Sequence, residues 1–437
     1  MNTITPGLAA LPAEKKQWFV EDRFGMFIHW GLYSLPARHE WVKNREEIST
    51  EDYQKYFDHF DPDLYDPAEW AKMARAAGMK YVVLTTKHHE GFCLWDSAVT
   101  DYKVTETPYG KDLLGPFVEA FRAEGLKVGF YYSLIDWHHP DFPVDPFHPQ
   151  RNDPEAARMN EGRDISRYAS YMRDQVRELL TGFGKIDVIW FDFSYPNRLH
   201  NELPGKGHKD WQSEELVKLV RDLQPEIIIN NRLDLVDLPA DVTTPEQYVP
   251  REWPKVKGEN VTWEACHTLS GSWGYHRDED TWKSPDQLIR LLVDTVSMGG
   301  NLLMNVGPTG RGLLDDRAVS ALDVYGKWMK LNGRSIYGCT QSSLEAPQDC
   351  RLTQRGNRLY VHLFSWPFRH LHLDGLAGKV RYAQFLHDAS EVLIVPADEE
   401  DPWNPTQVKV APTSVTLELP VRKPDVLVPV IELFLED

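Results

Sequence analysis

The sequence predicts an α/β protein with a (β/α)8-type, TIM-like barrel over residues 1–340 and an antiparallel β-sandwich over residues 341–437. Three observations support this fold class. Apolar, strand-like runs alternate with segments of helical period over about 340 residues, the pattern of a parallel α/β fold. Almost every one of these runs ends in polar or aromatic residues. Beyond Cys339 the helical segments stop, and short apolar runs separated by turn residues replace them.

The expected barrel strands are apolar runs that cover, in chain order, residues 24–31, 80–89, 127–133, 186–196, 226–232 and 300–308. The helical segment before the second run ends at Gly78, which suits a helix C-cap. The segment before the last run begins with Ser284-Pro285, a cap followed by a favoured first helical residue. We expect the last barrel helix at 315–338. The two remaining strands should lie within 241–275, where the pattern is weak and rich in loop residues.

Two features favour a barrel over an open, doubly wound sheet. Polar and aromatic residues end nearly every strand, whereas an open sheet concentrates its functional residues at one switch point. The first expected strand is also not followed by a GxGxxG motif or a P-loop, the nucleotide-binding signatures of open sheets.

The residues after the barrel have the sequence pattern of an antiparallel sandwich. Their short apolar runs are RLYVHLFSW, VRYAQFLHD, SEVLIVP, SVTLELP and VPVIELFLED, each bounded by turn residues. We therefore place a domain boundary near residue 340.

Composition limits the partners and the compartment. The chain has 437 residues and a formal net charge of −18, which disfavours nucleic acid and anionic membranes as partners. Its four cysteines are far apart and form no CxxC pair, so a disulfide framework or a thiolate zinc site is not expected. The N-terminal residues lack the pattern of a signal peptide, and no apolar run is long enough to span a bilayer. We therefore expect a cytoplasmic protein.

The run IDVIWFDFSYP, residues 186–196, carries the first candidate catalytic group. Its apolar residues predict a strand buried on both faces, and Asp192 stands where that strand ends. The carboxyl ends of barrel strands are where such folds hold their catalytic residues. The alternative role for Asp192 is capping of the following turn, so the other strand ends decide between the two.

The other strand ends carry a matching set of side chains. These candidates are His29, Trp30, His88, His89, Tyr131, Tyr132, Trp190, Asn231 and Arg232, joined by His39, Glu40 and Trp41 after the first strand and Trp95 after the second. Each has an ordinary alternative as a hydrogen-bonded or core residue. Together they predict a small pocket with apolar walls and several hydrogen-bonding groups. The 15 tryptophans also suit a sugar site, where indole faces pack against pyranose C–H groups.

A glycosidase needs a second carboxyl group, which protonates the leaving oxygen. Two downstream glutamates are candidates: Glu246 in TTPEQYVP and Glu264 in VTWEACHTLSGSWGY. Glu246 is expected on an exposed loop, from which an acid can reach a leaving group. Glu264 follows Trp263 in a more strand-like run and suits a carboxylate that orients a neighbour. The residues alone leave both open.

The motifs FGMFIHWGLYS, HEW, KHHEGFCLWDS, VGFYYSLIDW, IDVIWFD, NNR, TPEQYVP and WEACHTLSGSWGY occur in this order within about residues 15–340. In this set and order the sequence resembles the retaining α-L-fucosidases, a family of glycoside hydrolases. The resemblance implies hydrolysis of terminal α-L-fucosyl linkages in fucosylated glycans through a covalent fucosyl-enzyme, with transfucosylation as a further reaction. It implies neither a cofactor nor a metal.

The resemblance also implies roles for individual residues. Asp192 matches the nucleophile, and Glu246 matches the acid/base because that residue follows the strand with the arginine; Glu264 stays the alternative. The implied substrate-binding residues are His29, Glu40, Trp41, His88, His89, Tyr132, Trp190, Arg232 and Trp273. Family members are often oligomeric, which implies a homo-oligomer. One departure is Phe193, because many members have glycine after the nucleophile, and this leaves the acceptor specificity open.

Two other functions compete with this one. A metal-dependent barrel hydrolase would carry HxH after its first strand, but that strand ends His29-Trp30-Gly31, and the HxH at residues 370–372 lies in the predicted sandwich. The segment DWHHPDFPVDPFHP fits a polar loop better than a metal site. The second competitor is a catalytically weak fucose-binding relative or another barrel glycosidase. The presence of Asp192 with a suitable glutamate argues against a loss of catalysis.

Overall fold

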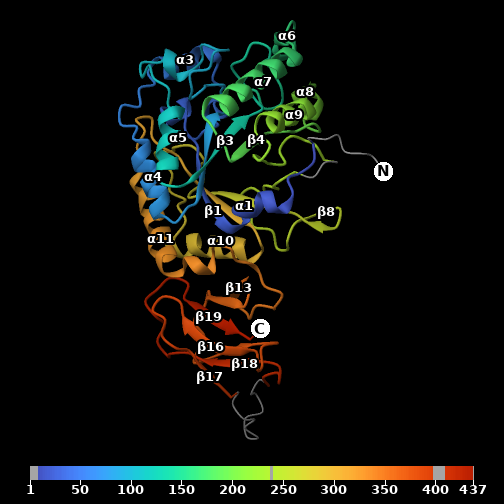
Figure 1. Cartoon of the computed structure of the whole chain (residues 1–437). Coiled ribbons are helices and arrows are strands. Elements are labelled where there is room, and N and C mark those ends of the chain that lie inside the picture. The colour runs from blue at the N-terminus through green and yellow to red at the C-terminus, as the bar shows by residue number, and fades with distance from the viewer. Residues whose placement is uncertain (1–7, 237–239, 397–408, 437) are drawn as a thin grey trace.

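The computed structural model describes residues 8–236, 240–396 and 409–436. Figure 1 shows an upper α/β part, blue to orange, and a lower part of antiparallel strands, orange to red. The elements of the α/β part are α1 (Gln17–Asp22), β1 (Phe24–Ile28), α2 (Val42–Arg45), α3 (Thr50–Asp58), α4 (Pro67–Ala76), β2 (Tyr81–Lys87), α5 (Leu114–Ala123), β3 (Lys127–Ser133), α6 (Ala156–Met159), α7 (Ile165–Gly182), β4 (Val188–Asp192), β5 (Leu199–His200), β6 (Leu203–Pro204), α8 (His208–Trp211), α9 (Ser213–Leu223), β7 (Ile228–Ile229), β8 (Lys255–Val256), β9 (Glu259–Asn260), β10 (Glu264–Thr268), α10 (Pro285–Ser297), β11 (Asn301–Val306) and α11 (Asp316–Asn332).

The α/β part is built on one parallel sheet, which in the described chain has seven strands in the order β10-β11-β1-β2-β3-β4-β7. The first strand lies between the last and the second, so that Phe24 of β1 pairs with Leu302 of β11 and Gly25 pairs with Tyr81 of β2. Strands β1, β2, β10 and β11 consist entirely of buried residues. This is the burial expected of a parallel sheet covered on both faces.

The structure corrects the prediction of eight regular barrel strands. Between residues 241 and 275 of the described chain, only β10 joins the parallel sheet as a regular strand. Residues 242–246 make isolated parallel bridges instead, which pair Asn230 with Val242, Thr243 with Trp263 and Glu246 with Cys266. Pro245 lies in this segment and has no N–H to donate, so a continuous ladder cannot form there. The result is a curled sheet whose end strands, β7 and β10, are connected through residues 242–246.

Helices cover the outer face of the sheet, and the inner face surrounds a small aromatic interior. On α7 the buried residues recur every three or four positions, as with Tyr168, Met172 and Val176. On β1, Met26 packs in the core under the helices, whereas Phe27 points to the other face and joins the inner cluster. The inner face therefore supplies the floor of any site at the end of the strands. Among the described helices, none has both the length and the apolar character that crossing a membrane requires.

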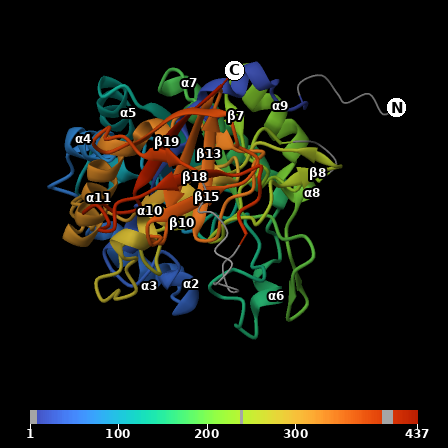
Figure 2. The ribbon, with the colours of Figure 1, turned by 90° about the horizontal axis from the view of Figure 1, so that it is seen from below.

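The C-terminal part consists of two antiparallel sheets with a common core. Its strands are β12 (Thr340–Gln341), β13 (Cys350–Arg355), β14 (Arg358–Leu363), β15 (His370–Leu373), β16 (Val380–Phe385), β17 (Leu393–Val395), β18 (Val415–Glu418) and β19 (Val430–Leu435). The sheet orders are β12-β13-β14-β19-β16 and β15-β18-β17. Figure 2 shows these strands lying over α10. Arg351 pairs with Asp294 of α10 at 2.6 Å, and Trp328 Nε1 of α11 donates to the carbonyl of Leu427 at 3.0 Å.

Candidate active site

A small pocket opens at the carboxyl ends of the parallel strands, where barrel enzymes carry their active sites. It is lined by Phe27, His29, Trp41, His88, His89, Tyr131, Trp190, Asp192, Phe193, Glu246, Cys266 and Trp273. Most of these residues are among those predicted from the strand ends and motifs. The strands therefore bring together side chains that are more than 200 positions apart in the sequence, since His29 and Trp273 lie on the same pocket.

Asp192 ends β4 inside this pocket. Its Oδ2 accepts a hydrogen bond from Tyr131 Oη at 2.8 Å, and its Oδ1 lies 3.2 Å from Nη1 of Arg232. Burial raises the pKa of Asp192 to about 6, although the Arg232 guanidinium acts to lower it. The carboxyl is therefore largely ionised at neutral pH, and two donors fix its orientation, as a nucleophile requires.

Arg232 joins the two candidate catalytic carboxylates. Its Nη1 faces Asp192, and its Nη2 lies 2.9 Å from Oε2 of Glu246. The guanidinium also lies over the Trp190 ring, 4.9 Å from the ring centroid, which fixes its plane. The Glu246 side chain is 42% exposed and that of Asp192 only 13%. Glu246 therefore stands on the open side of the pocket, where a leaving group would depart.

Glu264 lies deeper in the sheet interior and does not line the pocket. It is two residues before Cys266 on β10, so both point to the inner face, one layer apart. The Glu264 residue is 1% exposed, and its carboxyl accepts a hydrogen bond from the Tyr81 hydroxyl. Burial raises the pKa of Glu264 to about 7. A carboxylate in this position suits a structural role among the residues of the sheet interior. It is too deeply buried to reach the exocyclic oxygen of a sugar bound in the pocket.

Three histidines form one wall of the pocket. The ring centroids of His29 and His88 are 5.5 Å apart, and those of His88 and His89 are 4.0 Å apart. Burial lowers the pKa of His29 to about 3 and holds the pKa values of His88 and His89 well below the usual range. The imidazoles are therefore neutral near pH 7. Nε2 of His89 lies 4.0 Å from Oδ2 of Asp192, so this ring borders the Asp192 carboxylate.

Glu40 and Trp41 occupy different positions around the site. Trp41 lines the pocket, with its ring centroid 5.0 Å from that of His89. Glu40 is outside the pocket lining, 1% exposed, and its Oε2 accepts hydrogen bonds from the backbone N–H groups of Trp273 and Gly274 at 3.1 and 2.8 Å. Glu40 thus holds the segment that presents Trp273 to the pocket. Burial raises the pKa of Glu40 to about 7.

Tyr132 is a wrong assignment among the predicted substrate-binding residues. Side chains alternate along a strand, and on β3 it is Tyr131 that faces the pocket, beside its register partner Trp190. Tyr132 faces the helices, fully buried, and its hydroxyl donates to Gln175 of α7 at 2.7 Å.

Phe193 follows Asp192 with a φ of 83°, a left-handed conformation that is unfavourable for a bulky residue. Its ring lies 5.0 Å from His89, 5.3 Å from Trp41 and 4.9 Å from Phe147, measured between centroids. Aromatic contacts of this kind offset part of the cost of a strained backbone. Phe193 also lines the pocket, beside Asp192.

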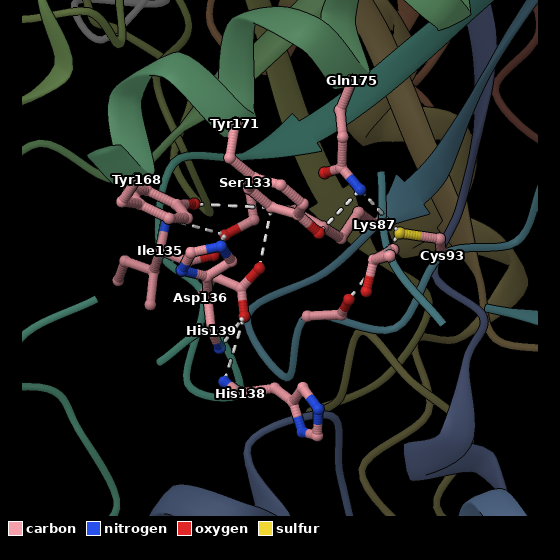
Figure 3. Close-up of polar contacts among 12 residues, drawn as sticks. Lys87, Cys93, Ser133, Ile135, Asp136, His138, His139, Tyr168, Tyr171 and Gln175 are labelled. Carbon is pink, nitrogen blue, oxygen red and sulfur yellow. Dashed lines mark hydrogen bonds and ion pairs between the residues drawn. The ribbon is translucent and has the colours of Figure 1, made fainter. Parts of the chain in front are cut away.

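A buried ion pair supports the histidine wall from behind. Lys87, the last residue of β2, lies 3.1 Å from Asp136, which follows β3, and both side chains are almost completely buried. The Lys87 ammonium also lies 4.4 Å from the ring centroid of Tyr132 and 5.4 Å from those of Tyr168 and Tyr171. Figure 3 shows the ion pair beside the two tyrosines of α7. This pairing fixes Lys87, the residue directly before the two histidines of KHH.

We expect the variant Lys87→Met to lower the free energy of unfolding by about 3–5 kcal/mol, because it leaves Asp136 buried without its counter-ion. Urea denaturation of the purified variant measures this loss. The matched control is Lys218→Met, which breaks the exposed pair with Asp222 on α9 and should cost less than about 1 kcal/mol. Equal losses for the two variants would contradict a supporting role for the buried pair.

A second cavity, of about 200 Å³, lies elsewhere on the α/β part. Its lining is mainly aliphatic, with residues such as Val217, Leu233 and Val261. Its charged groups are bound to partners: Arg221 pairs with Asp241, and Asp234 lies 3.1 Å from Nδ1 of His208. In the described ranges, no group of three or more His, Cys, Asp or Glu side chains is arranged to hold a metal ion.

Comparisons with known proteins agree with this geometry. The family described as alpha-L-fucosidase matches residues 4–334 of the chain. Human tissue alpha-L-fucosidase is 29% identical over 380 residues, which cover 80% of this chain and 76% of that protein. The solved structure of alpha-L-fucosidase isoenzyme 1 from Paenibacillus thiaminolyticus is 48% identical, covers 97% of this chain and 99% of its own, and superposes with a TM-score of 0.89.

A second solved structure comes from the alpha-L-fucosidase of Bacteroides thetaiotaomicron. It is 28% identical, covers both chains completely and has a TM-score of 0.83; it holds a trapped covalent intermediate formed with 2-fluoro-fucosyl fluoride. Two carboxylates at the strand ends of a parallel α/β sheet, with these relatives, define a glycoside hydrolase. The chain belongs to the α-L-fucosidase family.

Proposed function

We propose that this protein hydrolyses terminal α-L-fucosyl linkages of glycans with retention of anomeric configuration. The observation that carries the proposal is the position of Asp192 and Glu246 on one pocket, both bound to Arg232. Retaining glycosidases need two neighbouring carboxyl groups, of which one attacks and the other transfers protons. The trapped covalent intermediate of the Bacteroides relative supports the retaining course.

In the proposed mechanism Asp192 attacks the anomeric carbon while Glu246 protonates the glycosidic oxygen. A fucosyl-enzyme ester of inverted configuration forms, and the aglycone leaves. Glu246, now a carboxylate, takes a proton from water, which attacks the same carbon and releases Asp192. The two inversions give net retention. Capture of the intermediate by a sugar hydroxyl in place of water would give transfucosylation.

The pocket suits a 6-deoxy sugar bound through its ring hydroxyls. Neutral imidazoles of His29, His88 and His89 offer hydrogen-bonding nitrogens, and aromatic rings such as Trp41 and Trp273 offer apolar surface for the sugar methyl and C–H groups. Burial makes each lost hydrogen bond costly, which gives the site its selectivity.

Stereochemistry tests the proposal directly. The purified protein is incubated with an aryl α-L-fucoside, and the first sugar released is followed by proton NMR. We expect α-L-fucose to appear before mutarotation. Release of β-L-fucose would overturn the retaining mechanism, and an absence of turnover would overturn the assigned activity.

The pH dependence of the same reaction tests the role of Asp192. We expect kcat/KM to fall as the pH drops below about 6, because burial raises the pKa of Asp192 to about 6 and only the ionised carboxyl attacks. The pocket histidines cannot cause this loss of activity at acid pH, since burial lowers the pKa of His29 to about 3. Initial rates at low substrate concentration across the acid range measure it. A profile that stays flat down to pH of about 4.5 would contradict the assignment.

We further propose that the curled sheet acts as a (β/α)8 barrel in which residues 242–246 take the place of the missing strand. On this proposal the chain has two domains: residues 1–340 form the catalytic domain, and residues 341–437 form an accessory domain. A homo-oligomeric state and a cytoplasmic location stay predictions from the sequence.

A further inference from the structure

Two of the three pocket histidines are held from behind through the same ring nitrogen. Nδ1 of His29 lies 2.7 Å from Oδ1 of Asn305, on the neighbouring strand β11. Nδ1 of His89 lies 2.7 Å from Oγ of Ser133, the last residue of β3. In both rings Nε2 is thus the nitrogen left for a ligand. Which nitrogen carries the proton follows from what the two partners can accept.

Asn305 determines the proton position on His29. The Nδ2 amide of Asn305 donates to the carbonyl of Trp273 at 2.6 Å. A carbonyl can only accept, so the amide orientation is fixed and Oδ1 is the atom that faces the imidazole. An amide oxygen also only accepts, and Nδ1 of His29 must therefore be the donor. In a neutral ring this leaves Nε2 without a proton.

Ser133 determines the proton position on His89 by a similar argument. Its hydroxyl lies 2.7 Å from the carbonyl of Ile135 and accepts from the backbone N–H of the same residue at 3.1 Å. Figure 3 labels Ser133, the last residue of β3, and Ile135, two residues further along the chain. The hydroxyl has one proton, which must go to the Ile135 carbonyl. Towards His89 it can then only accept, so Nδ1 is again the donor and Nε2 again carries the lone pair.

We propose that Asn305 and Ser133 are positioning residues that fix His29 and His89 in the Nδ1–H form, so that both present an Nε2 acceptor to the sugar. The proposal rests on the fucosidase function proposed above and assigns the direction of two of its hydrogen bonds. The bound sugar must donate from two hydroxyl groups. Asp192, 4.0 Å from the His89 nitrogen, also only accepts when ionised, so this side of the pocket selects hydroxyl donors over acceptors.

Methyl ethers of the sugar hydroxyls distinguish this arrangement, in which the histidines accept hydrogen bonds from the sugar, from one in which they donate them. A methoxy group still accepts a hydrogen bond but cannot donate one. Aryl fucosides mono-O-methylated at each ring hydroxyl in turn should therefore include poor substrates, with kcat/KM reduced on the order of ten- to hundred-fold beyond any effect of size. Fluorinated analogues with fluorine in place of each hydroxyl are the size control, because fluorine is small and also cannot donate.

Imidazole spectroscopy tests the tautomers independently of turnover. The whole protein is labelled with ¹⁵N-histidine, and His29→Gln and His89→Gln variants assign the two rings in long-range ¹H–¹⁵N spectra. We expect both rings to show a protonated Nδ1 and an unprotonated Nε2. A protonated Nε2 in either ring would overturn the proposal for that ring, whether or not the protein hydrolyses fucosides. A failure of the fucosidase assignment is thus distinguishable from a failure of the tautomer assignment.

The variants Ser133→Ala and Asn305→Ala test the positioning role. We expect Ser133→Ala to change the His89 signals and to raise KM on the order of ten-fold, and Asn305→Ala to do the same for His29. The matched control is Thr86→Ala, which also removes a fully buried hydroxyl that donates to a backbone carbonyl, that of Tyr131. Its imidazole signals should match the wild type. Unchanged His89 signals in Ser133→Ala would overturn the role of Ser133, and if that variant fails to fold, the wild-type spectrum still decides the tautomer.

Discussion

Replacement of Asp192 by alanine is expected to reduce hydrolysis of an aryl α-L-fucoside by about four orders of magnitude or more, the scale of losing a catalytic nucleophile. Of the two carboxylates in the described pocket lining, Asp192 is the more deeply buried, and Tyr131 and Arg232 hold it in a fixed orientation. Without it the covalent intermediate cannot form. Steady-state rates of purified protein, checked for contaminating activity, measure the loss.

Chemical rescue distinguishes a lost nucleophile from a damaged fold. In Asp192→Gly, external azide can occupy the vacated space and attack the anomeric carbon, and the expected product is β-fucosyl azide. The matched control is Asp187→Asn, which changes a second aspartate directly before the same strand, where its carboxyl accepts from the N–H of Val128. The control should retain activity in its folded fraction. Near-native turnover by Asp192→Ala would exclude the nucleophile assignment.

The strand ends were the most predictable part of the site. A buried parallel strand appears in the sequence as an apolar run, and the place where the run stops marks the edge at which the strands converge. This is why His29, His88, His89 and Asp192 could be placed together from the sequence. The structure brings them to one pocket because strand order makes neighbours of β1, β2, β3 and β4.

Three features could not be predicted from the strand pattern. The facing of Tyr131 and Tyr132 depends on the phase of the alternation, and both residues are aromatic, so the run itself does not reveal which one points inward. The role of Glu40 depends on the path of a loop, since its backbone partners at Trp273 and Gly274 lie far along the chain. The place of residues 242–246 between β7 and β10 could not be predicted either, because isolated bridges around a proline give no periodic pattern in the sequence.

The buried Lys87–Asp136 pair illustrates the same limit. The sequence shows a lysine before two histidines, and a lysine is seldom fully buried unless it is paired. Its carboxylate partner follows β3, and the tyrosines around it come from β3 and α7, so only the folded structure brings them together. Residues predicted as substrate contacts, such as Tyr132, therefore belong in part to the layer that supports the histidines.

The second large effect concerns the acid/base. We expect Glu246→Ala to slow unactivated fucosides by roughly a hundred- to ten-thousand-fold, the contribution of a positioned proton donor. Substrates with a very acidic phenol should be far less affected, because their leaving group departs with little protonation. Rates for a series of aryl fucosides of different phenol pKa measure this effect. The rate of the variant should depend on the leaving-group pKa much more steeply than the rate of the wild type.

Azide and a matched glutamate variant complete the assignment of the acid/base. With Glu246 absent, azide can attack the fucosyl-enzyme without general-base help, so it should accelerate turnover and give α-fucosyl azide, the retained anomer. Glu264→Ala is the comparison, because its carboxyl is enclosed with Tyr81 in the interior and should affect stability more than leaving-group dependence. Glu246 is on the open side of the pocket and shares Arg232 with Asp192, which places the two carboxyl groups close to one another, as a retaining mechanism requires. If Glu264→Ala gives the steep dependence and the azide product while Glu246→Ala hydrolyses unactivated fucosides normally, the two roles must be exchanged.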